Sequence, residues 1–252
     1  MNHPGVRKFD RVAEIYDATR GGEERGRYHA HELSQLLRRE DLVLEIGIGT
    51  GLVALALSEI GFNVVGIDIS PLMLRRAWER IGSRVAVADA AVLPVASVST
   101  RQVYAVWVLH HVHDRAAAFR EIARVLRPGG LFVTVPPSAA SPDPISDLVH
   151  DMSIRLGAPS VESPDLEGLA AEAGLRLVET RLCTPYSFAQ SPNEAAAQIE
   201  ARSEVYLHDV TDEQWAQVVL PTIAALRALP GPDQPIVRSP KKIWALVFER
   251  LG

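Results

Sequence analysis

Short apolar runs alternate with helix-patterned segments through the first half of the chain. Strand-like runs occupy residues 42–46, 63–67, 85–88, 103–109 and 131–135. Between them, apolar residues recur at the three- and four-residue spacing of helices, at residues 25–39, 51–60, 72–81 and 115–126. This order predicts βαβ units around a parallel sheet. The strands are nearly all apolar, as expected when helices cover both faces of the sheet.

The second half of the chain adds two more strands and two longer insertions. The strand-like runs are at residues 175–181 and 243–248, and helix-like patterns appear at 145–156, 195–207 and 212–229. We therefore predict an α/β fold with a Rossmann-like, seven-stranded, mostly parallel sheet. Three α/β/α layers would form the body, and a partly helical lid would be inserted near the C-terminal strands.

The same pattern predicts a single domain over residues 1–252. An N-terminal helical cap at residues 1–40 would precede a ligand-binding core at residues 41–135. Insertions at 136–174 and 184–240 would lie on the substrate side, next to the last strands at 175–183 and 241–250. A structureless loop as long as the second insertion would be unusual, which favours helical structure within it.

Composition and charge narrow the classes of function. The formal net charge of −5 argues against a nucleic-acid partner, because phosphate binding usually needs a basic face. The single cysteine, Cys183, excludes an internal disulfide and a multi-cysteine zinc site. No apolar stretch reaches the roughly 20 residues of a membrane span, and residues 1–11 lack an apolar signal segment. We expect a cytoplasmic protein without a membrane partner.

A glycine-rich turn follows the first strand and carries the most chemical information. Glu45 precedes Gly47, Gly49 and Gly51, and a helical pattern begins directly afterwards. Glycines allow a ligand to approach the backbone, and the helix N-terminus offers unpaired amides. The dinucleotide pattern Gly-x-Gly-x-x-Gly does not fit, because Leu52 stands where its third small residue is needed. The glycines could also serve only as turn residues.

This acid and its three glycines resemble the first motif of the class I S-adenosylmethionine-dependent methyltransferases. Further similar segments follow the family's order, at residues 9–17, 66–70, 87–91, 109–114 and 125–131. The resemblance covers residues 9–135 and implies S-adenosylmethionine as the cofactor. It does not extend to residues 136–240, so it leaves the methyl acceptor open.

The resemblance implies roles for individual residues. Asp68 would bind both ribose hydroxyls, for which the paired acceptors of a carboxylate are suited, and Asp89 would meet the adenine amino group. Tyr16 and Arg20 would close over the methionine end, although packing or solvation could equally explain them. The whole implied cofactor site is Tyr16, Arg20, Glu45, Gly47, Gly49, Gly51, Asp68, Ile69, Met73, Asp89, Ala90 and Val106.

Glu45 lies within an apolar strand, where an unpaired carboxylate is costly to bury. We therefore expect its side chain to face the cofactor's ammonium group or the amides of the glycine turn.

Three histidines, His110, His111 and His113, follow the fourth strand. Their spacing does not by itself support a metal site, since no converging third ligand is visible, and we predict none. Packing at the strand end explains at least one of them. Because ligands bind at the carboxyl ends of parallel strands, His110 or His111 is also a candidate to accept a proton from the acceptor.

The resulting prediction is transfer of a methyl group from S-adenosylmethionine to an oxygen, nitrogen or carbon nucleophile of a small organic metabolite. S-adenosylhomocysteine would be the second product. One alternative is an enzyme that binds the same cofactor but catalyses a cyclisation without methyl transfer. Another is a non-catalytic cofactor-binding protein. The sequence leaves the oligomeric state open.

Overall fold

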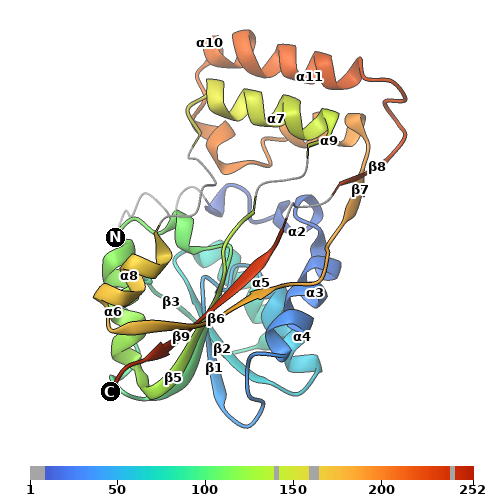
Figure 1. The fold of residues 1–252 in the computed structure, drawn as a ribbon. Coiled ribbons are helices and arrows are strands. Elements are labelled where there is room, and N and C mark those ends of the chain that lie inside the picture. The colour runs from blue at the N-terminus through green and yellow to red at the C-terminus, as the bar shows by residue number, and fades with distance from the viewer. Residues whose placement is uncertain (1–8, 139–141, 159–164, 239–241) are drawn as a thin grey trace.

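The computed structural model describes residues 9–138, 142–158, 165–238 and 242–252. Its body is a seven-stranded sheet with the strand order β3-β2-β1-β4-β5-β9-β6 (Figure 1). The strands are β1 (Leu42–Ile46), β2 (Asn63–Asp68), β3 (Val85–Val87), β4 (Thr100–Val106), β5 (Leu126–Val135), β6 (Leu175–Leu182) and β9 (Trp244–Arg250). Neighbours from β3 to β5 pair in parallel, and β9 is antiparallel to both β5 and β6. The predicted α/β fold is confirmed.

Helices cover both faces of this sheet, because each face carries a continuous apolar core. One face packs against α3 (Gly22–Ser34), α4 (Leu52–Glu59) and α5 (Pro71–Ile81). The other packs against α6 (Arg115–Val125) and α8 (Leu166–Glu172). On this second face the rings of Phe119, Phe132 and Phe248 contact one another, with centroids 5.7–6.4 Å apart. The arrangement gives the three predicted layers.

Local sequence sets where these helices begin. Ser70 caps α5 by accepting a hydrogen bond from the Met73 amide at 3.1 Å, and Pro71 follows at the first helical position. Asp114 caps α6 in the same way through the Ala117 amide, at 2.8 Å. Each capping residue thus stands between the carboxyl end of a strand and the start of the next helix.

The predicted position of β4 was wrong at both ends. The expected strand at residues 103–109 lies instead at Thr100–Val106. Trp107 takes a positive φ of 51°, and Leu109–His111 then forms a 3₁₀ turn. A positive φ is incompatible with an extended strand, so the apolar run continues past the point where the backbone turns away. As a result, residues 107–111 lie at the edge of the sheet.

A second group of helices packs together as a separate layer beyond the carboxyl edge of the sheet (Figure 1). This helical subdomain contains α7 (Pro144–Arg155), α9 (Pro192–Glu200), α10 (Asp212–Gln214) and α11 (Leu220–Arg227). It has its own apolar core, which includes Ile145, Met152, Ala196, Leu207, Val219, Ile223 and Leu226. A short antiparallel pair, β7 (Phe188–Gln190) with β8 (Ile236–Arg238), lies at its base and was not predicted.

The structure also corrects the limits of two helices predicted within the second insertion. The helix expected at 195–207 ends at Glu200, and a 3₁₀ turn follows at Val205–Asp209. The helix expected at 212–229 is interrupted by a π-helical turn at Trp215–Val219. Pro221 has no amide to donate to Gln217, whose carbonyl accepts instead from Arg155 at 3.3 Å.

One helix of the structure was not predicted, and some residues of the predicted cap, insertions and last strand are not described. α8 was not anticipated, and its Leu166 and Ala170 pack in the sheet core rather than in the helical subdomain. Residues 1–8 of the expected cap, 139–141, 159–164 and 239–240 of the expected insertions, and residue 241 of the last strand are not described. In the part of the chain that is described, no helix combines the length and apolar character needed to cross a bilayer.

Candidate functional site

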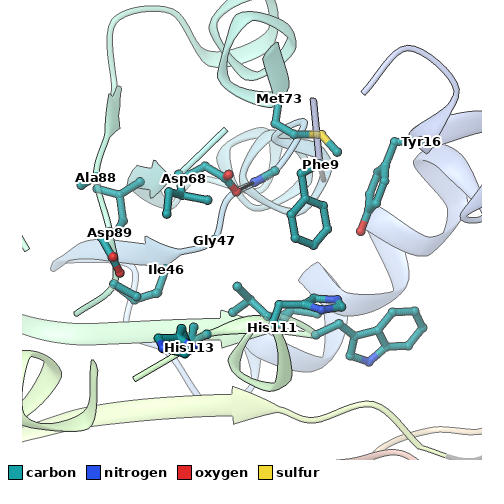
Figure 2. Close-up of a pocket in the computed structure, with 18 residues that line it drawn as sticks. Phe9, Tyr16, Ile46, Gly47, Asp68, Met73, Ala88, Asp89, His111 and His113 are labelled. Carbon is teal, nitrogen blue, oxygen red and sulfur yellow. Dashed lines mark hydrogen bonds between the residues drawn. The ribbon is translucent and has the colours of Figure 1, made fainter. Parts of the chain in front are cut away.

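A cavity opens at the carboxyl ends of β1, β2 and β4, the edge where open α/β sheets bind ligands (Figure 2). Its volume is about 780 Å³ when the space open to solvent at its mouth is counted. Its walls contain, from the predicted cofactor site, Tyr16, Gly47, Gly49, Asp68, Ile69, Met73, Asp89, Ala90 and Val106. The other members of that set, Arg20, Glu45 and Gly51, lie outside the lining.

The glycine turn forms the floor of the cavity where β1 leads into α4. Gly47 has a φ of 70°, and a Cβ placed there would come within 2.2 Å of Val108 Cγ2. Any side chain at this position would therefore displace the segment that follows β4. Gly49 also has a positive φ but lies in open space, so a ligand can approach its backbone. Gly51 serves as the N-cap residue of α4, away from the cavity.

Asp68, at the end of β2, is held by two backbone amides. Its Oδ2 accepts from the Gly49 amide and its Oδ1 from the Ser70 amide, each at 2.8 Å. Burial raises the pKa of this carboxyl, and the amide hydrogen bonds oppose that rise. Each carboxylate oxygen can accept more than one hydrogen bond. The side chain thus retains acceptor capacity for a pair of neighbouring hydroxyls, which fits the ribose of the implied cofactor.

Asp89 and several apolar side chains continue the same side of the cavity. Asp89 follows β3, and its Oδ1 accepts from the Ala91 amide at 2.9 Å. Ile69, Met73 and Ala90 line the cavity around it. Figure 2 shows Asp68 and Asp89 on one side of the cavity and Tyr16 on the opposite side. A ligand spanning the cavity would therefore meet carboxylates at one end and aromatic rings at the other.

Glu45 has a different partner from the one predicted. Its buried carboxyl accepts a hydrogen bond from the Tyr104 hydroxyl at 2.6 Å, and Glu45 does not line the cavity. Burial raises the pKa of this carboxyl well above its usual value. The side chain thus links two neighbouring strands, β1 and β4, beneath the glycine turn.

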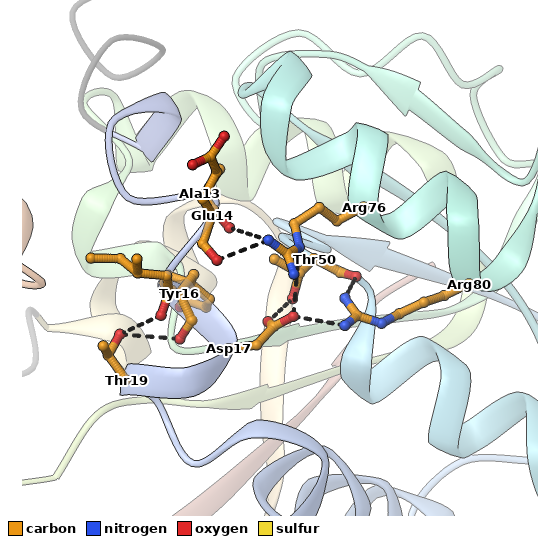
Figure 3. A network of polar contacts seen from close by, with 9 residues as sticks. Ala13, Glu14, Tyr16, Asp17, Thr19, Thr50, Arg76 and Arg80 are labelled. Atoms are coloured by element: carbon orange, nitrogen blue, oxygen red, sulfur yellow. Dashed lines mark hydrogen bonds and ion pairs between the residues drawn. The ribbon is translucent and has the colours of Figure 1, made fainter.

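The N-terminal segment is fastened over the cavity by an ionic network centred on Asp17, in α2 (Tyr16–Thr19) (Figure 3). Asp17 Oδ1 accepts from the Thr50 hydroxyl at 2.6 Å, and Oδ2 accepts from Arg80 Nη2 at 2.7 Å. Arg76 donates to the carbonyl of Glu14 at 2.9 Å. Thr50 belongs to the glycine turn, so this network ties the segment carrying Tyr16 directly to the floor of the cavity.

Arg20 is committed to another contact. Its guanidinium donates to both carboxylate oxygens of Glu204, at 2.5 and 2.7 Å, and to the carbonyl of Ser203 at 3.3 Å. Glu204 lies between α9 and the following 3₁₀ turn. The ion pair therefore joins the N-terminal segment to the helical subdomain. The role predicted for Arg20 at the methionine carboxylate would require sharing or replacing Glu204.

The histidines separate into two environments. His111 and His113 line the cavity, and the His111 ring meets Phe9 edge-on with centroids 4.9 Å apart. His110 is not in the lining, and burial lowers its pKa to about 4. No group of three or more His, Cys, Asp or Glu side chains within the described ranges could hold a metal ion.

Several cavity residues were missed by sequence reasoning. Phe9 and His113 lie in two segments that resemble the family, and their aromatic rings are the signal that could have placed them in the wall. Trp107, Val108 and Val112 were assigned to a strand or left unassigned, because nothing in the apolar run revealed the turn after β4. Their place in the wall depends on the positive φ of Trp107.

Comparison with known proteins places these features in a family. Residues 44–134 match the family described as a methyltransferase domain. The 27-O-demethylrifamycin SV methyltransferase of Amycolatopsis mediterranei is 32% identical over 193 residues, covering 71% of this chain and 70% of that protein. The O-methyltransferase cnsE of Penicillium expansum is 30% identical over 54% of this chain. The chain spans about half the length of that second relative, 52%.

The fold comparison agrees. The crystal structure of the [4+2]-cyclase SpnF superposes with a TM-score of 0.60 at 17% identity, covering 98% of this chain and 96% of that one. At this identity the similarity concerns the fold alone. The extended match to the rifamycin relative, together with the ordered motifs and the cavity they form, shows that the chain belongs to the class I S-adenosylmethionine-dependent methyltransferases.

Proposed function

We propose that this protein transfers a methyl group from S-adenosylmethionine to a nucleophilic atom of a small organic metabolite. The observation that carries the proposal is the cavity that joins the glycine turn, Asp68 and Asp89 to an aromatic wall. The names of the two curated relatives, both methyltransferases, support a small-molecule acceptor. Because one name specifies an O-methyltransferase and the other an O-demethyl substrate, hydroxyl compounds are the first acceptors to test, ahead of nitrogen and carbon nucleophiles.

The residues present fit the cofactor of the family. Asp68 would bind the ribose hydroxyls, Asp89 the adenine amino group, and Gly47 and Gly49 would let the cofactor lie against the backbone. When bound, S-adenosylmethionine supplies a methyl group on a sulfonium, which is a good leaving group. The protein's main contribution is to hold the two reactants in line, an effect worth as much as about 7–11 kcal/mol.

The acceptor would enter on the side of the cavity that faces the helical subdomain. The helices α7, α9, α10 and α11 form that layer, and we propose that it acts as a lid that excludes water and selects the acceptor. The Arg20–Glu204 ion pair supports this role, since it fastens the layer to the segment that carries Tyr16.

His111 is the better candidate for a general base. It lines the cavity, whereas His110 is outside the lining and has one buried ring nitrogen without a hydrogen-bond partner among the described residues. A base is needed only where the attacking atom carries a proton. For such an acceptor, His111→Asn should lower kcat by about 10²–10⁴-fold, and the exposed His31→Asn should leave it unchanged. An unchanged kcat in His111→Asn would remove the base assignment while leaving methyl transfer intact.

The function itself is tested by calorimetry followed by product mass. We expect S-adenosylmethionine and S-adenosylhomocysteine to bind and NAD not to bind. Incubation with a panel of hydroxyl compounds should give products heavier by one methylene unit. A product of unchanged mass would indicate the cyclase alternative, and binding without any turnover the non-catalytic one. Binding of NAD alone, or of none of the three, would contradict the proposal.

A further inference from the structure

Arg25 is partly buried behind two aromatic rings of the cavity wall and pairs with no carboxylate among the described residues. Its Cζ lies 5.0 Å from the centroid of the Trp107 ring and 5.7 Å from that of the Tyr16 ring, and both rings line the cavity. Among the residues that the structure describes, no carboxylate pairs with Arg25 and no acceptor takes a hydrogen bond from its guanidinium. By contrast, Arg20 and Arg27 on the same stretch of chain are bound to Glu204 and Glu23.

Unused donors and acceptors gather beside this charge. The indole Nε1 of Trp107 is buried without a hydrogen-bond partner in the described part of the chain, and so are both ring nitrogens of His29. The His29 and Trp107 rings meet edge-on with centroids 5.1 Å apart. Trp107 also holds a positive φ of 51°, a conformation that is uncommon for non-glycine residues. Buried polar groups without partners are rare, so this cluster points to a ligand.

The cluster lies across the cavity from the carboxylates that we assign to the adenosine. Tyr16 stands across the cavity from Asp68 and Asp89 (Figure 2). Tyr186, on the segment that leads from β6 to the helical subdomain, borders Gly21 together with Arg25. The charge is therefore placed between the cavity and the layer that we propose selects the acceptor.

We propose that Arg25 and the Trp107 indole N–H form an anion subsite for the methyl acceptor, which is then an aromatic molecule carrying a carboxylate or another anionic oxygen. This inference rests on the proposed function. A guanidinium offers a planar pair of N–H donors that matches a carboxylate, and it is held here by the faces of two rings. The rings of Trp107, Tyr16 and Phe9 supply flat apolar walls for an aromatic acceptor.

The test uses two probes that differ in charge alone, 2-naphthoate and 2-naphthamide. Each is titrated into protein saturated with S-adenosylhomocysteine, and binding is followed by calorimetry and tryptophan fluorescence. The wild type should bind the naphthoate more tightly by about tenfold or more. Arg25→Gln should abolish this preference, and Arg25→Lys should retain part of it. Arg27→Gln, an exposed neighbour paired with Glu23, is the matched control and should keep the full preference.

Clear results would overturn the inference. A wild type that binds the naphthoate no more tightly than the naphthamide, or binds neither, contradicts it; so does a preference that survives in Arg25→Gln. If Arg25→Gln weakens S-adenosylhomocysteine but not 5′-methylthioadenosine, which lacks the amino-acid part, Arg25 binds the cofactor's carboxylate instead. Failure of the wild type to bind S-adenosylhomocysteine would reject the proposed function separately. The wild-type ratio and Arg25→Lys decide the matter even if Arg25→Gln does not fold.

Discussion

The two sides of the cavity are built by different means. On the cofactor side, contacts are local: Asp68 accepts from the Gly49 amide, only 19 positions away in sequence, and from Ser70, two positions away. On the acceptor side, contacts join distant segments. Arg20 binds Glu204 across 184 positions, and Arg238 reaches Asp143 across 95. One side is thus a short motif folded on itself, and the other is an assembly of separate parts.

This difference explains why one side carries a family signature and the other does not. A site held by backbone amides requires particular residues at fixed spacing, here a carboxylate and glycines. A site formed between a sheet and a helical layer can use many side chains, provided that the layer packs. We therefore expect substitutions on the cofactor side to weaken cofactor binding. Substitutions between the sheet and the helical subdomain should instead change how the subdomain packs.

The largest expected effect tests the cofactor side. Asp68→Asn replaces one acceptor oxygen by a donor, so it removes a hydrogen bond to the ribose and disturbs the bond from the Gly49 amide. We expect S-adenosylhomocysteine to bind about tenfold to a hundredfold more weakly, by calorimetry. Asp143→Asn is the matched control, because Asp143 also accepts two backbone amides but caps α7 in the helical subdomain. If both variants lost the same affinity for S-adenosylhomocysteine, the two sides of the cavity would not differ in the way described.

The pH dependence of binding sharpens the same prediction. Burial raises the pKa of Asp68, so its carboxylate is protonated at a higher pH than an ordinary aspartate. Affinity for S-adenosylhomocysteine should therefore fall as the pH is lowered through this raised pKa. The Asp68→Asn variant should show no such fall. A wild-type affinity that stays constant at acidic pH would contradict the role of this carboxylate.

A smaller effect, on the stability of the fold, concerns Glu45, which links β1 to β4 just before the glycine turn. Its pKa is raised by burial in the folded state, so its contribution to stability is full below the unfolded pKa and is lost as the pH rises through the folded pKa. Glu45→Gln keeps an acceptor for the Tyr104 hydroxyl and removes this loss. We expect the variant to be more stable than the wild type at pH 8, and the gain to be smaller at pH 5, by urea unfolding.

The control for Glu45 is a surface glutamate, Glu213→Gln, whose effect should not depend on pH in this way. A variant of Glu45 that destabilises the protein equally at both pH values would show that its carboxylate is needed in the charged form. The hydrogen bond between the two strands would then be made to a charged carboxylate rather than to a neutral carboxyl group.

The smallest effect tests the connection between the two sides. A double-mutant cycle with Arg20→Gln and Glu204→Gln should give a coupling energy of about 0.5–1 kcal/mol, because the pair is bidentate but partly exposed. Binding of S-adenosylhomocysteine should change less than the KM for the acceptor. A loss confined to S-adenosylhomocysteine would assign Arg20 to the cofactor, as the family resemblance implies.

The sheet could be predicted because the spacing of apolar residues and the glycine turn are visible within short stretches of sequence. The apolar runs at residues 42–46 and 63–67 became β1 and β2 with nearly the expected ends. The turn after β4 could not be found in this way, since Trp107 looks like another strand residue and its positive φ is imposed by the surroundings. The three-residue strands β7 and β8 were missed because so short a pairing depends on tertiary contacts.

Residue identity alone also failed for side chains whose partners are remote in sequence. Arg20 and Arg25 both lie in the predicted helical cap and look alike in sequence. Only the structure shows that Arg20 is paired with Glu204 and that Arg25 stands over two aromatic rings. Glu45 was correctly expected to need a partner, but the partner came from the neighbouring strand.

The position of β9 between β5 and β6 has a consequence for how the chain folds during synthesis. β6 ends at Leu182 and, within the described ranges, pairs with no strand other than β9, which begins at Trp244. Residues 183–243 must therefore leave the ribosome before β6 can pair, a delay on the order of 3–12 s. During that interval the edge of β5 is open while α9, α10 and α11 of the helical subdomain are being synthesised. The nascent sheet would then be most exposed to aggregation just before its completion, and chaperone binding would matter most at that stage.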